Sequence, residues 1–163
     1  MKAKPLPTLS ITDKQRFDLS SLRGAWSTSK EFLPNGGILI KDAIQAVSIC
    51  KGKDALSAED VREHFSGKIL LGPSVMKALL DEHAKVCEHA RVCVDEESTL
   101  EKIYQETSAM KLCFSGCDLT DEAGCIFWVY LFRVGFQRWT HNVRWHKMGF
   151  DGTFTFVTYS VKE

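Results

Sequence analysis

Apolar residues recur at helical spacing through the middle of the chain. From Ser74 to Cys93 they fall on one stripe, and Pro73 stands where a first helical turn tolerates proline. The apolar positions are Val75, Leu79, Val86, Ala90 and Cys93, with Leu80, His83 and Cys87 beside them. The opposite side carries the charged residues Lys77, Asp81, Glu82, Lys85 and Glu88. The pattern predicts a long amphipathic helix.

A second helix is expected directly after the first. Ser98 and Glu101 have the spacing of a capping box, and apolar residues follow at helical intervals as far as Met110. The two segments together predict a helix hairpin over about residues 74–111, with residues 95–97 as its connection.

Two further helical segments are expected before this hairpin. Ser57 has the character of an N-cap and Gly67 that of a helix stop, so a short helix should lie between them. The apolar segment 38–50 is expected to end as a helix. These segments make the N-terminal two-thirds of the chain helical.

The composition changes after Lys111. Residues 113–125 are expected to form a glycine-containing loop, and the chain then becomes rich in Phe, Trp, Tyr, Val, Ile and Thr. This composition favours strands at roughly 126–134, 138–148 and 153–161, joined as an antiparallel meander. The alternative is a mostly α protein with one long helix over 120–146, because Trp128, Phe132, Phe136, Trp139 and Val143 also recur at helical spacing.

The expected fold is therefore α+β, with the helical part packed on a C-terminal three-stranded meander. A chain of 163 residues fits a single domain, 1–163, in which residues 1–35 can form an arm. Because 21 basic and 21 acidic residues cancel, no long-range field draws the chain to nucleic acid or to a membrane. An electrostatic partner must be recognised by a local patch.

The apolar runs and the cysteines of the sequence indicate where the protein is located. The start of the chain has no apolar run of the kind found in secretory signals, and the longest apolar run, residues 125–132, is far shorter than the roughly 20 residues that span a bilayer. Six cysteines without a secretory signal are typical of reduced thiols. We expect an intracellular, cytoplasmic protein with no membrane partner.

The C-terminal strands contain the strongest candidate for a binding surface. Along 138–148 the side chains alternate, so Trp139, Val143 and Trp145 point to one face of the strand and Arg138, Arg144 and His146 to the other. An Asp151-Gly152 turn would place Arg144 opposite Tyr159, within reach of a cation–π contact. Arginines and aromatic rings on one sheet face are typical of single-stranded nucleic-acid binding, and Trp and Arg are enriched at protein interfaces. The candidate binding residues are Arg133, Arg138, Trp139, Arg144, Trp145 and His146.

The cysteines offer the other candidate chemistry. Cys113, Cys117 and Cys125 form a C-x3-C-x7-C array to which His141 or His146 can add a fourth zinc ligand. A cysteine in the 113–125 loop can also act as a nucleophile if a histidine serves as its base. The chain contains no G-x-S-x-G, G-x-x-x-x-G-K, H-E-x-x-H or G-x-G-x-x-G motif.

The sequence therefore favours a small intracellular, non-enzymatic binding protein that self-associates. Its C-terminal basic and aromatic hairpin is expected to contact a protein or single-stranded nucleic acid, without a cofactor. Two alternatives remain open: a cysteine-nucleophile enzyme that uses the 113–125 loop, and an interaction module stabilised by zinc.

Overall fold

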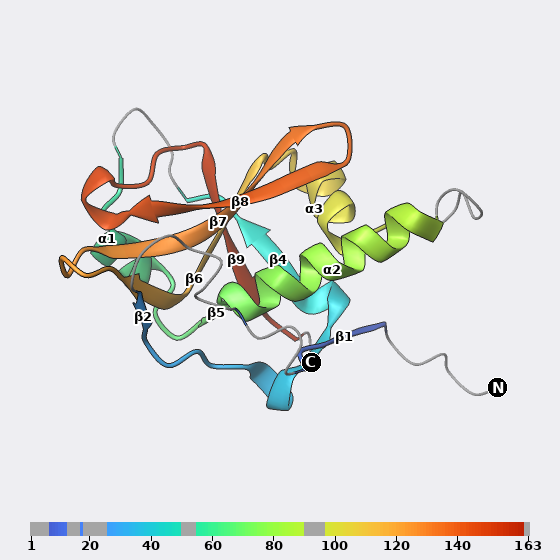
Figure 1. The fold of residues 1–163 in the computed structure, drawn as a ribbon, viewed down its shortest axis with the longest axis horizontal. Coiled ribbons are helices and arrows are strands. Elements are labelled where there is room, and N and C mark those ends of the chain that lie inside the picture. Colours follow the sequence, from blue (N-terminus) through green and yellow to red (C-terminus); the bar gives the residue numbers. More distant parts are fainter. Residues whose placement is uncertain (1–6, 13–16, 18–25, 50–54, 90–96, 162–163) are drawn as a thin grey trace.

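A mixed β-sheet with helices on both sides forms the body of the protein (Figure 1). The computed structural model describes residues 7–12, 17, 26–49, 55–89 and 97–161. The strands are β1 (Thr8–Ser10), β2 (Ser27–Thr28), β3 (Ile38–Ile40), β4 (Ile44–Val47), β5 (Ile69–Leu70), β6 (Lys111–Thr120), β7 (Ile126–Gly135), β8 (Arg138–Trp145) and β9 (Phe154–Tyr159). The α-helices are α1 (Ala58–His64), α2 (Pro73–His89) and α3 (Thr99–Thr107), and short 3-10 turns lie at η3 (Pro34–Gly37), η4 (Lys41–Ala43) and η5 (His146–Met148).

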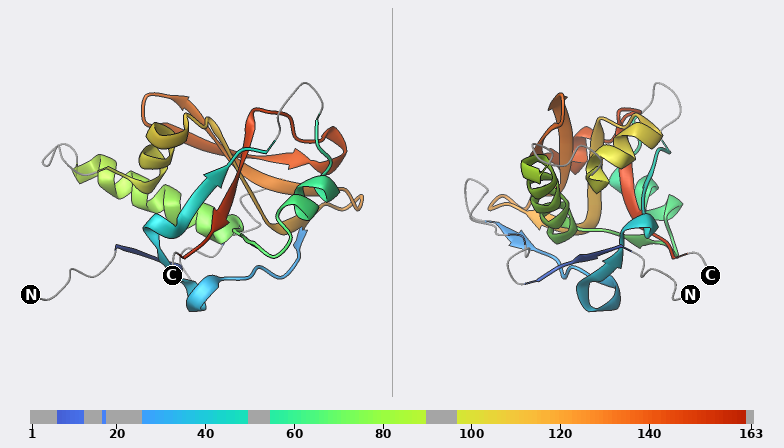
Figure 2. Two further views of the ribbon diagram at one scale, coloured as in Figure 1. Left: turned by 180° about the vertical axis from the view of Figure 1, so that it is seen from behind. Right: turned by 90° about the vertical axis from the view of Figure 1, so that its right-hand side faces the viewer.

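The main sheet has seven strands, of which five follow the order β4-β9-β6-β7-β8. Strand β9 is antiparallel to β4 and parallel to β6, and β4 and β9 are seen side by side from behind in Figure 2. Strands β5 and β2 pair with β9 and β6, and β1 pairs with β3 in a separate two-stranded sheet. The described part of the N-terminal segment thus packs on the body, where the Trp26 and Phe127 rings lie 5.1 Å apart.

The predicted three-stranded meander is wrong in its connectivity. Strands β7 and β8 form the expected hairpin, but β9 does not lie beside β8. All six residues of β9 are buried, which requires a neighbour on each side and cover on both faces. The chain therefore crosses from the edge strand β8 to the middle of the sheet. Asp151 accepts hydrogen bonds from Thr153 at this crossing instead of starting a two-residue hairpin turn.

The predicted helical N-terminal two-thirds is also wrong. Residues 38–47 form β3, η4 and β4, because their Ile and Val side chains suit strands and Ile44–Val47 pairs with β9. The alternative long helix over 120–146 is excluded by the β7–β8 hairpin. The helices α1, α2 and α3 are confirmed, with Ser57 and Ser98 as N-caps. The expected extension of α2 to Cys93 and most of the 95–97 connection lie outside the described residues.

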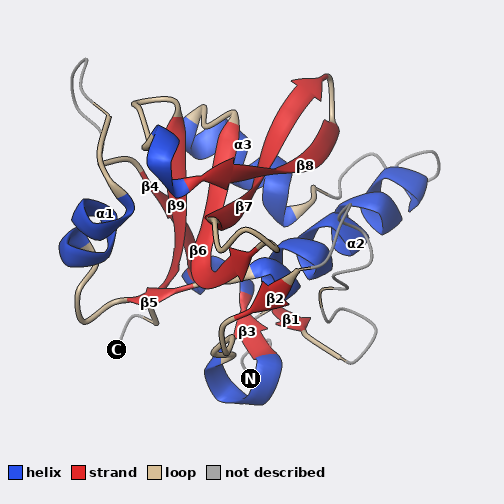
Figure 3. Ribbon diagram, turned by 60° about the vertical axis from the view of Figure 1, so that its left-hand side comes forward, coloured by secondary structure: helices blue, strands red, loops and turns tan. Residues whose placement is uncertain are grey.

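Two hydrophobic cores lie on the two faces of the sheet. The larger packs α2 and α3 on one face, where Leu79, Leu100 and Leu112 are fully buried. The smaller packs α1 on the other face, where Phe65 meets Trp128 and other aromatic residues. Figure 3 shows α1 and α2 on opposite sides of the sheet. Because α1 is short, it covers only one end of its face.

Candidate functional site

The part of the sheet beyond α1 presents a partly uncovered face on β6, β7 and β8. The register pairs Tyr130 with Asn142 and Phe132 with both Thr140 and Lys111, and cross-strand partners share a face. We call this surface the open sheet face. Its residues are Lys111, Tyr130, Phe132, Thr140, Asn142 and Arg144. Asn142 is exposed and the others are half-buried.

Two aromatic rings and two cations lie close together on the open sheet face. The ring centroids of Tyr130 and Phe132 are 5.8 Å apart, and Tyr130 meets the buried Phe154 ring edge-on at 5.2 Å. Lys111 Nζ lies 4.9 Å from the Phe154 centroid, and Arg144 Cζ lies 5.1 Å from the same point. Both cations are attracted to the negative face of that ring.

The local charge of this face is positive although the chain is neutral overall. Residues 126–150 contain no Asp or Glu. Asp151 is an acid beside the face, and the Thr153 hydroxyl and N–H, assisted by Lys111 and Arg144, hold its pKa below the usual value. The face therefore has two cations, Lys111 and Arg144, and one neighbouring carboxylate, so its net charge is positive.

Arg144 belongs to the open sheet face, but its predicted partner is wrong. Its cross-strand neighbour is Trp128, and its Nε donates to the carbonyl of Gly149 at 2.9 Å. Tyr159 lies on the central strand β9, where its hydroxyl accepts the N–H of Ile40. The predicted Arg144–Tyr159 contact required β9 to follow β8 as a neighbour, which it does not.

Arg133 and Trp139 are held against α3 and do not reach the open sheet face. Arg133 donates to Glu101 through Nε at 3.2 Å and through a terminal nitrogen at 2.9 Å. Trp139 Nε1 donates to the same carboxylate at 3.0 Å, and the Arg133 guanidinium lies 4.0 Å from the Tyr104 ring centroid. The side chains of Glu101 and Arg133 are only 8% and 12% exposed. Both predicted binding residues thus serve intramolecular contacts.

The remaining three predicted binding residues have three different environments. Arg138 is exposed at the start of β8 and forms no ion pair with any described residue. Trp145 is half-buried, with Lys147 Nζ 5.6 Å from its ring. His146 packs against Trp128 with 4.4 Å between ring centroids, and its Nε2 is buried without a hydrogen-bond partner in the part of the chain that the structure describes. The six predicted residues therefore do not form one surface.

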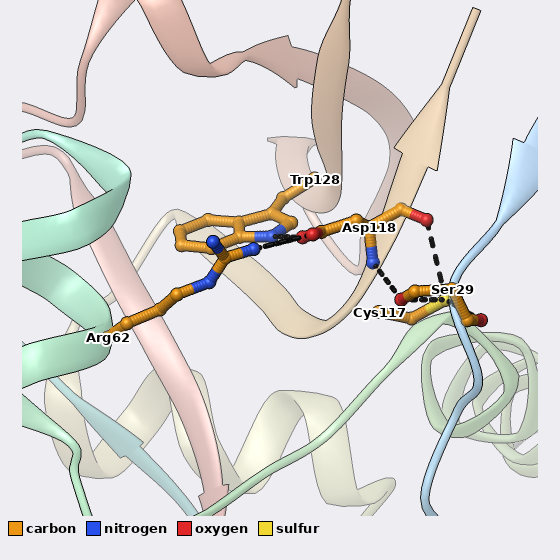
Figure 4. Close-up of polar contacts among 5 residues, drawn as sticks. All are labelled: Ser29, Arg62, Cys117, Asp118 and Trp128. Carbon is orange, nitrogen blue, oxygen red and sulfur yellow. Dashed lines mark hydrogen bonds and ion pairs between the residues drawn. The ribbon is translucent and has the colours of Figure 1, made fainter.

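Asp118 connects α1 to the sheet beside the open sheet face (Figure 4). Arg62 of α1 donates to its two carboxylate oxygens at 2.5 and 2.6 Å, and Trp128 Nε1 donates to Oδ1 at 2.7 Å. The Asp118 N–H donates to Ser29 Oγ at 2.9 Å, and the Cys117 thiol donates to the Ser29 carbonyl at 3.2 Å. Asp118 therefore joins α1, β6 and β7. Because its carboxylate already accepts hydrogen bonds from Arg62 and Trp128, it is not available as a base.

Two of the three cysteines in residues 113–125 lie on a strand and not in the predicted loop. Cys113 and Cys117 belong to β6, and Cys125 lies in the turn that follows. Burial raises the pKa of Cys113 well above its usual value and also raises that of Cys117, whereas nucleophilic attack and metal binding require thiolate. Among the described residues, no group of three or more His, Cys, Asp or Glu side chains is placed to hold a metal ion.

His83 and Cys87 stand four residues apart on α2, a spacing that permits metal ligation, and the structure brings them close together. Cys87 Sγ lies 3.5 Å from His83 Nε2. The same nitrogen lies 2.7 Å from the Gln137 carbonyl, which can only accept, so Nε2 carries a proton. Nδ1 lies 2.7 Å from Ser98 Oγ. Because Nε2 is already protonated, it cannot take the proton of Cys87, and the pair lacks the base that a nucleophilic cysteine needs.

His146 gives the folded state a dependence on pH. Burial lowers its pKa, Arg62 lowers it further, and Asp118 opposes both. The unfolded chain therefore binds more protons at this position, so the free energy of unfolding should fall as the pH drops below about 6.5. The His146→Phe variant, which keeps a ring against Trp128, should lose that part of the slope. Urea unfolding between about pH 7.5 and pH 5 measures the difference.

Trp145 supplies the control for this measurement, because its half-buried ring carries no titratable group. The Trp145→Phe variant should keep the acid slope of the parent protein. Equal slopes in the parent and in His146→Phe would contradict the assignment.

Five of the six residues of the open sheet face were not among the predicted binding residues: Lys111, Tyr130, Phe132, Thr140 and Asn142. Their signal was present, because the tight turn at residues 135–137 sets the β7–β8 register. That register places Phe132 opposite Thr140 and Tyr130 opposite Asn142. Lys111 could not be found in this way, since it was assigned to the end of a helix.

Comparisons with protein-family models, with curated proteins and with solved structures found no match for this chain. Within the described residues, no helix has the length and apolar character needed to cross a membrane.

Proposed function

We propose that this chain is a small, non-enzymatic binding protein whose open sheet face takes single-stranded RNA or DNA. The observation that carries the proposal is the placement of Tyr130 and Phe132 beside Lys111 and Arg144 on one face. Rings of this kind stack on bases, which have a π-face whatever their sequence, while the cations neutralise phosphate. Thr140 and Asn142 add hydrogen-bonding groups on the same face.

A binding role is also supported by the state of the reactive groups. Cys113 and Cys117 have raised pKa values, and the Asp118 carboxylate is held by Arg62 and Trp128. An intracellular location is part of the proposal, because thiols of this kind persist in reducing compartments. Self-association is a further part, supported by Val134 and Phe136, which are 49% and 81% exposed at the β7–β8 turn.

Titration of fluorescent oligouridylate and oligothymidylate, followed by anisotropy, tests the nucleic-acid assignment. The Phe132→Ala variant should weaken binding roughly tenfold, since stacking on one ring contributes about 1–3 kcal/mol per base. Lys111→Ala and Arg144→Ala should weaken binding to all sequences and reduce the salt dependence by about one unit of slope each.

Phe32→Ala is the matched control, because this ring is exposed but lies outside the open sheet face. It should bind the oligonucleotides as the parent does. The assignment fails if Lys111→Ala combined with Arg144→Ala leaves binding unchanged at low and high salt. Sedimentation velocity at several protein concentrations tests self-association, and a monomer at all of them would contradict that part.

A further inference from the structure

Strand β8 forms one edge of the sheet. Among the described strands, it is hydrogen-bonded to β7 alone, and it is eight residues long. Arg138, His141 and Asn142 are exposed along it. An edge strand presents backbone N–H and C=O groups that another chain can pair with.

Two hydrogen bonds show which backbone groups of β8 point outward. The Arg133 N–H donates to the Met110 carbonyl at 2.9 Å, so odd-numbered residues of β7 direct their N–H groups toward β6. Their partners on β8 are also odd-numbered. Asn142 Oδ1 accepts the N–H of Val143 at 2.8 Å, which places that group outside the ladder as well. The outward backbone groups are those of Trp139, His141, Val143 and Trp145.

The positive charge along the β8 edge favours an acidic partner strand over a second copy of β8. Residues 126–150 contain no acid, and Arg138 and His141 are exposed on β8. Two copies of β8 paired antiparallel about His141 would place Arg138 opposite Arg144 of the other copy, and like charges directly opposite are destabilising. A partner strand that carries Asp and Glu would instead place acidic side chains opposite Arg138 and Arg144, and opposite charges across two strands are stabilising.

We propose that the free edge of β8 binds an acidic, extended peptide segment of a partner protein as an additional strand. Backbone hydrogen bonds supply the affinity in this mode, and alternate side chains supply the selectivity. The Asn142 side chain occupies the Val143 N–H in the free protein and must release it when the strand binds. This site uses outward backbone groups of β8 and not the rings and cations of the open sheet face. A failure of the nucleic-acid proposal would therefore not contradict it.

A fluorescent peptide of alternating Glu and Val, about as long as β8, is a suitable probe for anisotropy titration at about pH 8, where histidine is neutral. The full chain should bind it at least tenfold more tightly than a Lys-Val peptide of the same length. The Asn142→Ala variant should bind it about threefold to tenfold more tightly, because the Val143 N–H becomes available for one more hydrogen bond.

The exposed His141 allows a matched pair of variants. The His141→Pro variant removes an outward N–H without touching the β7 ladder and should weaken binding about tenfold. His141→Thr keeps that N–H and should bind as the parent does. The parent protein should also bind poorly to a probe peptide that is N-methylated at alternate residues, a result that does not depend on how any variant folds.

Several results would overturn the proposal. Equal affinity for the N-methylated and unmodified peptides would exclude strand addition. Equal affinity for the Glu-Val and Lys-Val peptides would exclude the acidic partner. Dimerisation that appears only in Asn142→Ala without peptide would assign the edge to a second copy of the chain.

Discussion

Replacing Glu101 with alanine is expected to lower the free energy of unfolding by about 3–5 kcal/mol, because the change leaves a nearly buried arginine without its counter-charge. Glu101 accepts two hydrogen bonds from Arg133 and one from Trp139. Burial raises the pKa of Glu101, but these hydrogen bonds outweigh it and hold the pKa below its usual range. The contribution is therefore present at neutral pH and lost as the pH falls through the folded-state pKa. Urea denaturation at neutral and acid pH measures both effects.

The next residue of α3 provides the control. Lys102 pairs with Asp42, and the two side chains are 52% and 57% exposed. Because an exposed pair contributes about 0–1 kcal/mol, Lys102→Ala should change the unfolding free energy far less than Glu101→Ala. Similar losses in the two variants would show that the Glu101–Arg133 contact has no special role.

Trp128→Ala is expected to destabilise the protein by about 3–5 kcal/mol through the cavity that it creates. The indole is fully buried, and its centroid lies 4.9 Å from that of Phe150 and 6.4 Å from that of Phe156. The Trp128→Phe variant keeps most of this packing but removes the N–H that Asp118 accepts, so it should lose about 1.5–3 kcal/mol. Urea unfolding of both variants separates packing from hydrogen bonding.

Trp145 is the matched control, because it is half-buried on the neighbouring strand and contacts Lys147. Trp145→Ala should cost much less than Trp128→Ala, and equal midpoints of unfolding would contradict the assignment of Trp128 to the core. A double-mutant cycle of Trp128→Phe with Arg62→Ala should show coupling, since both side chains donate to Asp118.

Local signals in the sequence predicted the helix starts and the alternation along β8, but not the strands within 38–47 and 111–120. Ser57 and Ser98 cap helices as expected, and Trp139 and Val143 pack against the larger core as the alternation along β8 indicates. The capping box at Ser98 is only half formed, because the Glu101 side chain turns to Arg133. A tertiary ion pair has replaced a local hydrogen bond, and spacing within one helix cannot reveal that.

Long-range pairing accounts for most of the errors. The place of β9 between β4 and β6 depends on partners at 44–47 and 111–113, which no local turn signal specifies. The same is true of the binding surface: Arg133 has a basic side chain in the sequence, but its distant partner Glu101 removes it from the surface. The environments of Arg138 and Arg144 also depend on the fold. Arg144 donates to the Gly149 carbonyl, whereas Arg138 is exposed.

The central position of β9 also determines when the sheet can be completed during synthesis. Strands β6, β7 and β8 are joined by short connections and can pair as they leave the ribosome. Strand β4 leaves much earlier, but its partner at 154–159 is translated about a hundred residues later. Until then, β4 and one side of β6 present unpaired backbone and apolar side chains to the solvent. We expect this nascent chain to need chaperone protection, and to be prone to aggregation whenever translation stops before Phe154.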